Sequence, residues 1–358
     1  MFYRETGQFK TSYAADQQIF PIRQDRVGVA LLLAFAFAVV PLIATQYWFS
    51  AILIPFLIFS LAALGLNILT GYAGQLSLGS AAFMAVGAFG AYNFILRVPG
   101  MPPVVAFLLG GFCAALVGIA FGLPSLRITG FCLAVATLAA QFFVVWALTK
   151  FGWFSNHSSS GVITAQDITV LGVAIDSPLK KYLLTLTIVS VLALAAKNMV
   201  RSNTGRSWMA VRDMDVAAEV IGIPLMKTKL LAFAVSSFYC GVAGALAAFC
   251  YLGTVEPEYF TLDLSFRILF MIIIGGVGSI LGSFLGSAFI VLLPIVLNIT
   301  LHPLFGLFGL EISSEVTSNM ELMVFGALII FFLAVEPHGL ARLWQIGKEK
   351  LRIWPFPH

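Results

Sequence analysis

The chain has 358 residues, of which 60% are hydrophobic and only 10% are charged, and its formal net charge is +4. Soluble domains carry about 25% charged residues, so these charges cannot cover a water-exposed globule of this size. The composition excludes a soluble enzyme, a secreted domain, a disordered region and a nucleic-acid-binding protein. It predicts an all-α, polytopic membrane protein.

Long stretches of the chain, such as 27–96 and 268–310, contain no Asp, Glu, Lys or Arg and are apolar on every side. About 20 such residues span a bilayer as a helix, whereas the strands of a membrane barrel alternate apolar and polar residues. Glycine, proline and polar residues divide the stretches into about ten helices. In chain order we expect these at 27–46, 50–70, 78–96, 104–123, 131–149, 182–200, 229–251, 264–276, 282–299 and 320–336. The third is rich in small residues and the eighth is short, so both are candidates for broken or re-entrant segments.

The distribution of Lys and Arg predicts the orientation. With both termini on one side, fifteen basic residues lie on that side and four on the other. The side with the excess is the cytoplasmic one. We therefore expect a cytoplasmic N-terminal tail at 1–26, a transmembrane domain at 27–337 and a cytoplasmic C-terminal tail at 338–358. The longest cytoplasmic loop is then 201–229, and 151–181 is a periplasmic loop.

The membrane interior shows no means of coupling transport to an ion gradient, because such coupling needs ionisable groups at membrane depth. Arg267, Glu321 and Glu336 lie near expected helix ends, where long side chains reach water. The glycines of 74–79 resemble a phosphate-binding loop, but the lysine that would reach the phosphates is missing. The four cysteines fall within expected helices and form no CxxC pair, so we expect neither a metal site nor a disulfide. The protein is therefore a passive channel, or its energy comes from another subunit.

Small and polar residues mark the candidate interior sites. Gly278, Gly282 and Gly286 recur every fourth residue, a pattern that lets helices pack closely in lipid. The glycine-rich turns 71–79 and 275–282 resemble each other faintly and are candidates for flexible backbone lining a path. A substrate path also needs a few convergent polar groups. The candidates are Asn67, Gln75, Ser77, Thr137 and Gln141.

The loop at 201–229 carries a helical pattern. Val211, Met214, Ala218 and Ile221 are spaced as one face of a helix, which Trp208 and Leu225 extend. Gly222 and Pro224 are stop signals. We expect one short amphipathic helix at about 206–221 on the cytoplasmic surface. It either rests on lipid or docks a partner, and Ala217 and Ala218 would let a partner approach closely.

Several motifs resemble a known family. The loop reads GRSWMAVRDMDVAAEVIGI, and a second segment, beginning at Leu66, reads LNILTGYAGQLSLGSAAFMAVGA. Shorter signatures are Ala136-Thr137-Leu138-Ala139 and Gly275-Gly276-Val277-Gly278. Together, over about residues 27–340, these motifs resemble the permease subunits of ATP-binding-cassette (ABC) importers of the branched-chain amino-acid type, the LivM-like family.

The resemblance implies a bacterial inner-membrane permease that is not an enzyme and forms half of a translocation pathway. It implies three kinds of protein partner: a second homologous permease subunit, two cytoplasmic ABC ATPase subunits that bind ATP, and a periplasmic solute-binding protein. The chain itself would lie in the lipid bilayer. This chain would carry no catalytic residue, cofactor or metal of its own. The loop positions matched to ATPase coupling are Arg212, Asp213, Ala217, Ala218, Glu219 and Gly222. The outer acidic residues that could meet the binding protein are Glu256, Glu258, Asp263, Glu311 and Glu315.

Two departures from the family pattern keep the substrate open. A glycine-rich turn after the fifth helix is reduced to Gly161, and Gln141 stands near a position where amino-acid importers often carry Gly-Glu. The substrate is expected to be a branched-chain or other hydrophobic amino acid. Urea, an amide, or an aromatic or hydrophobic carboxylate is the alternative for the same architecture.

Three readings from other classes compete. A passive channel for small neutral solutes would not need a docking helix in the 201–229 loop. A polytopic membrane enzyme would need His, Asp or Glu clustered at one membrane face, and the sequence has no such cluster. An ATP-driven exporter would need no periplasmic partner.

Overall fold

The computed structural model describes residues 11–12, 18–20, 23–125, 131–158, 162–165, 168–170, 173–306, 320, 323–324, 326–328, 330–332, 334 and 339–353. Within them, seven helical segments are long and apolar enough to cross a membrane. These are Gln24–Ile43, Trp48–Tyr72, Pro103–Leu123, Cys132–Lys150, Pro178–Arg201, Leu225–Leu252 and Ile280–Leu297. The prediction of an all-α protein that crosses the membrane several times is thereby supported.

The α-helices are bounded as follows: α2 Arg23–Ala34, α3 Val40–Ile43, α4 Ile54–Asn67, α5 Ser80–Arg97, α6 Pro103–Ser125, α7 Phe131–Lys150, α8 Pro178–Arg201, α9 Asn203–Asp213, α10 Asp215–Val220, α11 Leu225–Leu246, α12 Leu262–Gly275, α13 Ile280–Gly306 and α15 Gly339–Ile353. Short π- and 3-10-helical turns extend or connect some of them: η1 Phe35–Val39, η2 Trp48–Leu53, η3 Ile68–Tyr72, η4 Ala247–Leu252 and η5 Pro257–Tyr259.

Nine of the ten expected spans coincide with helices of the structure. The third and the eighth, now α5 and α12, are not among the seven long spans; α5 follows a non-helical segment and α12 has only 14 residues. The expected span at 320–336 lies largely outside the described residues, although those described within it are helical. The expected C-terminal tail contains a helix, α15, that the sequence reading did not anticipate.

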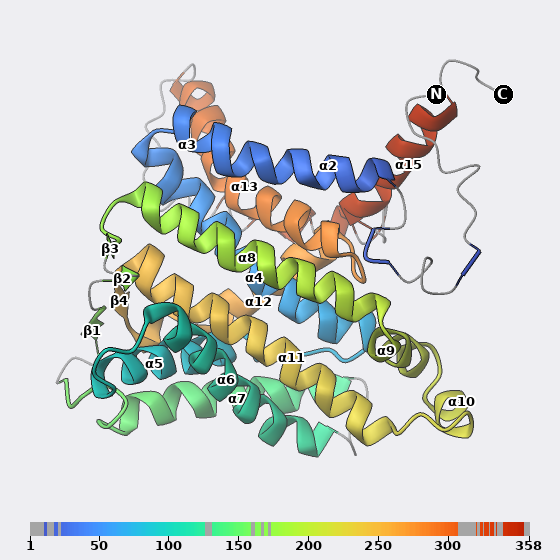
Figure 1. Cartoon of the computed structure of the whole chain (residues 1–358), viewed down its shortest axis with the longest axis horizontal. Coiled ribbons are helices and arrows are strands. Elements are labelled where there is room, and N and C mark those ends of the chain that lie inside the picture. Colours follow the sequence, from blue (N-terminus) through green and yellow to red (C-terminus); the bar gives the residue numbers. More distant parts are fainter. Residues whose placement is uncertain are drawn as a thin grey trace.

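The helices run along the long axis of the molecule, with α11 at their centre (Figure 1). It packs against α6, α5 and α4, while α13 and α12 pack against each other and against α4. Glycine makes these approaches close: a Cβ at Gly87 would collide with the backbone of Gly241, and one at Gly244 with the backbone of Met84. Such backbone-to-backbone packing is the usual way in which helices associate in lipid.

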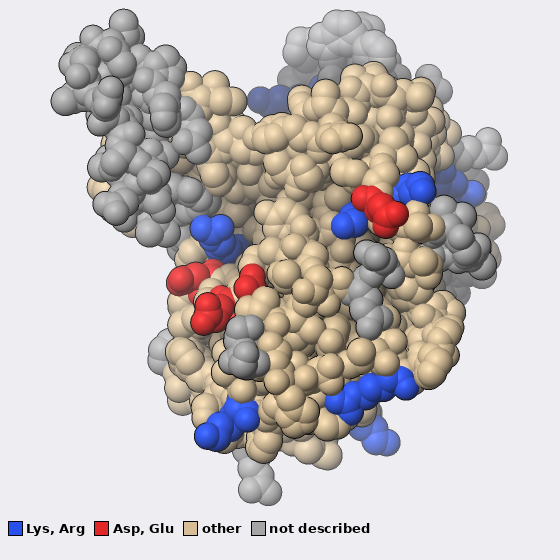
Figure 2. All heavy atoms as spheres, turned by 90° about the vertical axis from the view of Figure 1, so that its left-hand side faces the viewer, with Lys and Arg blue, Asp and Glu red and all other residues tan. Residues whose placement is uncertain are grey.

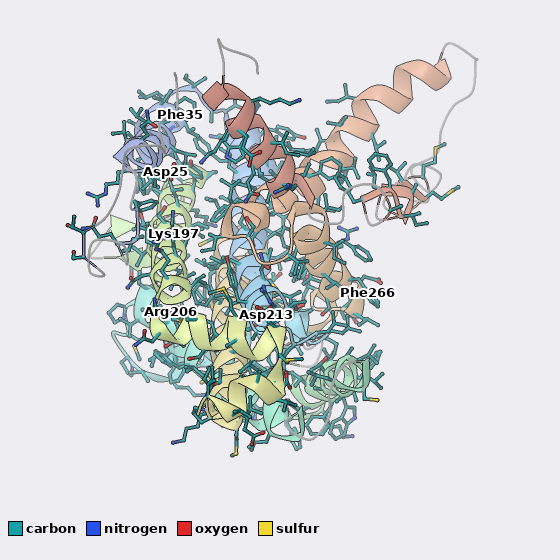
Figure 3. All side chains as sticks on the ribbon, turned by 90° about the vertical axis from the view of Figure 1, so that its right-hand side faces the viewer. Asp25, Phe35, Lys197, Arg206, Asp213 and Phe266 are labelled. Atoms are coloured by element: carbon teal, nitrogen blue, oxygen red, sulfur yellow. The ribbon has the colours of Figure 1, made fainter. Side chains whose placement is uncertain are left out.

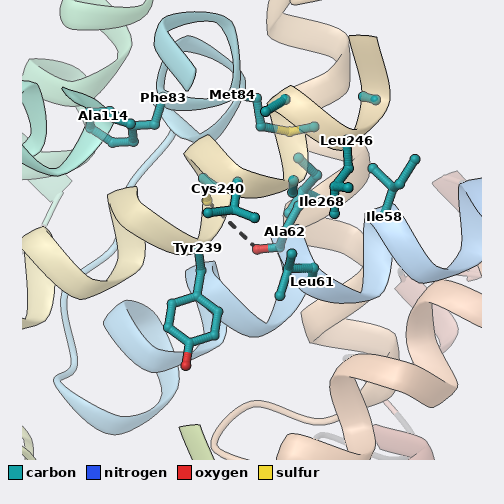
Figure 4. Packing of buried hydrophobic residues seen from close by; sticks show 14 of the residues in the cluster. Ile58, Leu61, Ala62, Phe83, Met84, Ala114, Tyr239, Cys240, Leu246 and Ile268 are labelled. Atoms are coloured by element: carbon teal, nitrogen blue, oxygen red, sulfur yellow. Dashed lines mark hydrogen bonds between the residues drawn. The ribbon is translucent and has the colours of Figure 1, made fainter. Parts of the chain in front are cut away.

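Apolar side chains fill the space between these helices (Figure 4). The thiol of Cys240 lies against the carbonyl oxygen of Ala62 at 3.8 Å, and both residues are fully buried among aliphatic neighbours. All four cysteines are free thiols. Cys240 therefore packs as a small apolar residue.

The two ends of the bundle differ. One end, here called the strand end, carries two small antiparallel pairs, β1 (Ile163–Thr164) with β4 (Thr254–Val255) and β2 (Thr169–Val170) with β3 (Val173–Ala174). The opposite end, here called the loop end, carries α9 and α10, with α15 on the same side (Figure 1). Loop 151–181 is thus anchored by pairing with the segment that precedes α12.

Candidate functional site

The connection between α8 and α11 is built from two short helices, not one. The expected single helix at 206–221 is wrong: α9 ends at Asp213, Met214 is extended with φ −162° and ψ 101°, and α10 begins at Asp215. The break lets the neighbouring charges bond to different elements. The Lys229 ammonium on α11 donates to the Asp215 carboxylate at 2.7 Å, while Arg212 turns toward the membrane helices.

The break also divides the expected apolar stripe. Trp208, Val211 and Ala218 are buried, and the Trp208 indole donates to the Thr228 carbonyl at 3.1 Å. Met214 and Ile221, which a continuous helix would place on the same face, are instead 66% and 72% exposed. The loop therefore presents an apolar surface, the loop patch, consisting of Met214, Val216, Val220, Ile221 and Met226.

The predicted coupling residues surround this loop patch. Ala217 and Glu219 are exposed, whereas Ala218 is buried and cannot meet a partner directly. Gly222 has φ +88° and open space around its Cα, so it ends α10 in a conformation that side chains disfavour. Figure 3 looks onto this end of the bundle, with Arg206 and Asp213 of α9 in the foreground.

The two glycine-rich turns lie against each other. Asn67, near the end of the second span, accepts a hydrogen bond from the Gly278 amide at 2.8 Å. Its own amide donates to the Ser279 carbonyl at 2.8 Å and to the Ser283 hydroxyl at 2.9 Å. A Cβ at Gly71 would lie 2.8 Å from the Cα of Gly278, so only glycine fits this contact. Asn67, the fully buried last residue of α4, thus holds the second turn, more than 200 residues away in the chain, beside the first.

Arg212 connects the loop to these turns. Its guanidinium donates to the Gly71 carbonyl at 2.9 Å and pairs with the Asp213 carboxylate at 2.8 Å. Gly74, with φ +70°, packs so closely that a Cβ there would lie 2.8 Å from the Arg212 side chain. A continuous set of contacts therefore runs from α9 through Arg212 and Gly71 to Asn67 and the start of α13. We call it the turn junction.

The other predicted path residues hold the beginning of α5. The Thr137 hydroxyl accepts from the Leu78 amide at 2.9 Å, and the Gln141 carbonyl oxygen accepts from the Ala82 amide at 2.6 Å. Ser77 accepts, at 3.3 Å, from the amide of Gly79. Ser265, which the sequence reading missed, accepts from the Ala81 amide at 3.0 Å. These oxygens satisfy amides that a helix start leaves without intrahelical partners.

All five predicted path residues are buried. Asn67, Ser77, Thr137 and Gln141 have the partners just described, and the side-chain oxygen of Gln75 is buried without a hydrogen-bond partner among the described residues. In this conformation they therefore support α5 and α13 from within and do not face open space.

The GxxxG glycines have two different positions. Gly282 and Gly286 lie in α13, where a Cβ would collide with backbone oxygens of α12. Gly278 lies outside the helix, in the turn before α13, with φ +80°. The expectation that all three form one helical ridge is therefore wrong for Gly278, whose place in the turn junction requires a left-handed backbone.

The chain is similar to known transport permeases over most of its length. The family model described as "Branched-chain amino acid transport system / permease component" matches residues 48–333. The high-affinity branched-chain amino acid transport system permease protein LivM of Escherichia coli is 25% identical over 307 residues, covering 79% of this chain and 68% of the relative. The probable LivM protein of Methanocaldococcus jannaschii is 23% identical over 327 residues, covering 81% of this chain and 92% of the relative. No solved structure matches the chain significantly.

Proposed function

Because the chain belongs to the family of branched-chain amino acid transport permeases, we propose that it forms half of the translocation pathway of an ABC importer. The observation that carries the proposal is the turn junction. It places the exposed loop in direct contact with the first turn, where Arg212 donates to the Gly71 carbonyl, and Asn67 in turn binds the second turn at Gly278. A force applied to the loop would therefore reach both turns without an intervening flexible segment.

The loop patch is the proposed ATPase docking surface. Five exposed apolar side chains, at Met214, Val216, Val220, Ile221 and Met226, are more than an isolated surface loop usually presents to water. Ala217 lies among them with little bulk, and Glu219 adds a charged contact at the edge. We propose that one of two cytoplasmic ABC ATPases binds here and supplies the ATP site that this chain lacks.

This assignment fixes the orientation. The loop end would face the cytoplasm, with both termini, and the strand end would face the periplasm of a bacterial inner membrane. The excess of basic residues on the loop-end side supports this direction. Glu256 and Glu258 follow β4 at the strand end, whereas Asp263 lies farther in, in the first turn of α12; Figure 2 shows acidic side chains gathered with basic ones on this face. We propose that it receives a periplasmic solute-binding protein; Glu311 and Glu315 lie outside the described residues.

A second, homologous permease subunit would complete the pathway, and the proposed substrate is a branched-chain or other hydrophobic amino acid. The relatives' names support this substrate class.

The proposal is tested by purifying the tagged chain in mild detergent from a host that expresses its genomic neighbours. We expect an ATPase and a second polytopic permease to co-purify, and proteoliposomes of the complex with its binding protein to take up leucine only with ATP. Reproducible recovery of the chain alone, or uptake that survives ATP depletion, would refute the importer in favour of a passive channel.

A further inference from the structure

One arginine lies in an unexpected place. From the sequence, Arg267 belongs to an outer helix end, where its side chain could reach water. In the structure it lies in the second turn of α12, a helix of 14 residues, or about 21 Å, too short for a bilayer core of about 30 Å. The depth at which α12 begins therefore decides whether Arg267 is near the surface.

Hydrogen bonds to α7 set that depth. Gln141 lies near the middle of α7, which has 20 residues and is one of the seven spans. Its amide donates to the Phe260 carbonyl at 2.8 Å, just before α12, and its oxygen lies 3.4 Å from the Ser265 hydroxyl of α12. The first turn of α12 is therefore level with the middle of a membrane-spanning helix.

Arg267 consequently lies about 15 Å from either membrane surface, half the bilayer core, which is farther than its side chain extends. It is nevertheless exposed at the surface of this subunit. A charged group at such depth rarely faces lipid and usually marks a water-filled cavity or a substrate pathway. The exposed side of α12 is therefore best explained as the wall of an aqueous space.

The surroundings of Arg267 form a compact set of groups, here called the α12 face. Phe266 and Phe270 flank it on the same side of the helix, with rings stacked at 6.1 Å between centroids. Tyr259, just before α12, is within electrostatic range of both Arg267 and Tyr251. Asp263 is exposed one turn before Arg267, so the face also offers an acceptor for an ammonium group. Figure 3 shows Phe266 on the side of the bundle away from Asp25 and Lys197.

We propose that the α12 face is a substrate-binding surface at which Arg267 binds the carboxylate of an amino acid and the rings of Phe266 and Phe270 contact its apolar side chain. Guanidinium matches carboxylate in charge and in planar geometry, which a neutral urea or amide cannot reproduce. The inference rests on the proposed importer function and narrows its substrate to a carboxylate with an apolar body.

Water access is tested first. In the assembled transporter, with Cys113, Cys132, Cys240 and Cys250 replaced by alanine, we would label Arg267→Cys with a charged methanethiosulfonate reagent. The control is Phe142→Cys, because Phe142 follows Gln141 at the same depth and is 58% exposed on α7. We expect labelling at 267 and none at 142. Failure of Arg267→Cys to label would overturn the proposal and assign Arg267 to a contact with the partner permease.

Substrate selection is tested by uptake into proteoliposomes. We expect Arg267→Gln to lower leucine uptake about tenfold or more, the size of a lost charged hydrogen bond. Arg267→Lys should keep part of the activity, and Lys150→Gln, which removes an exposed charge at the end of α7, should keep all of it. Unlabelled leucine, which has a carboxylate, should compete with labelled leucine for uptake. Leucinamide, which lacks the carboxylate, should not.

The outcomes separate the two proposals. If the wild-type complex takes up no probe with ATP and binds no ATPase, the importer function fails. If it transports with ATP but Arg267→Gln behaves like wild type, or if urea or leucinamide is preferred to leucine, the importer stands and the α12 face is wrong. Co-purification of each variant with its partner subunits shows that a loss of uptake is not a loss of assembly.

Discussion

Replacement of Asn67 by alanine should uncouple the loop from the membrane turns. The change removes the acceptor for the Gly278 amide and the two donors to Ser279 and Ser283. Hydrogen bonds inside membrane proteins are worth about 0.6 kcal/mol on average, and an unsatisfied buried backbone group costs about 1–3 kcal/mol. Two lost bonds at the average value and one stranded amide together give about 3 kcal/mol, which is roughly a 150-fold change in an equilibrium.

Two measurements test the effect of Asn67→Ala. The thermal midpoint of the purified complex should fall, and leucine transported per ATP hydrolysed should fall more steeply than stability alone explains. Asn93→Ala is the matched control, because Asn93 is also buried and its amide donates to two carbonyls, of Phe89 and Phe154, remote from the turn junction. We expect Asn93→Ala to lower the midpoint similarly while transport per ATP stays normal. If both variants lose stability and coupling in the same proportion, Asn67 is only a packing residue.

Three further predictions concern the loop. Arg212→Ala should lower ATP-dependent uptake into vesicles about tenfold, because it removes the charged hydrogen bond to Gly71. Arg206→Ala, at an exposed position of the same helix, should not lower it. Equal effects of the two variants would contradict the turn junction. Trp208→Ala should destabilise the protein by about 3–5 kcal/mol because the indole is fully buried. Trp344→Ala, at an exposed position, should destabilise it by about 0.5 kcal/mol or less. Similar thermal unfolding midpoints for the two variants would refute the predicted role of Trp208. Ala217→Arg should leave membrane insertion intact and abolish ATPase co-purification, and undiminished recovery of the ATPase would exclude the loop patch as its docking surface.

The sequence was sufficient for features that depend on local pattern. Charge-free stretches located nine helices within a few residues. The two glycine-rich turns were singled out from the sequence, but their contact with each other was not predicted. The break at Met214 could not be foreseen, because the 206–221 pattern suits a continuous helix and the break follows from partners of Arg212 and Asp215 far away in the chain.

The depth of α12 and Arg267 in the membrane could not be predicted from the sequence either. Arg267 is six residues after Thr261, close to what looks like a helix end, and only its neighbours' contacts with Gln141 reveal that this end lies inside the bundle. Likewise, Thr137 and Gln141 were recognised as polar groups in an apolar helix. That they satisfy the amides at the start of α5 depends on how α5 and α7 pack.

The glycine contacts at the centre of the bundle limit how the molecule can move. Where backbones touch, as at Gly87 with Gly241 and Gly244 with Met84, there are no side chains whose rotamers could absorb a sliding displacement. Helices α5, α6 and α11 should therefore behave as one rigid body during a transport cycle. Motion is then left to the rest of the molecule. The non-helical residues 73–79, before α5, and 276–279, between α12 and α13, are suited to act as hinges. A cross-link between α5 and α11 should accordingly be tolerated by a working transporter, while one across these hinges should arrest it.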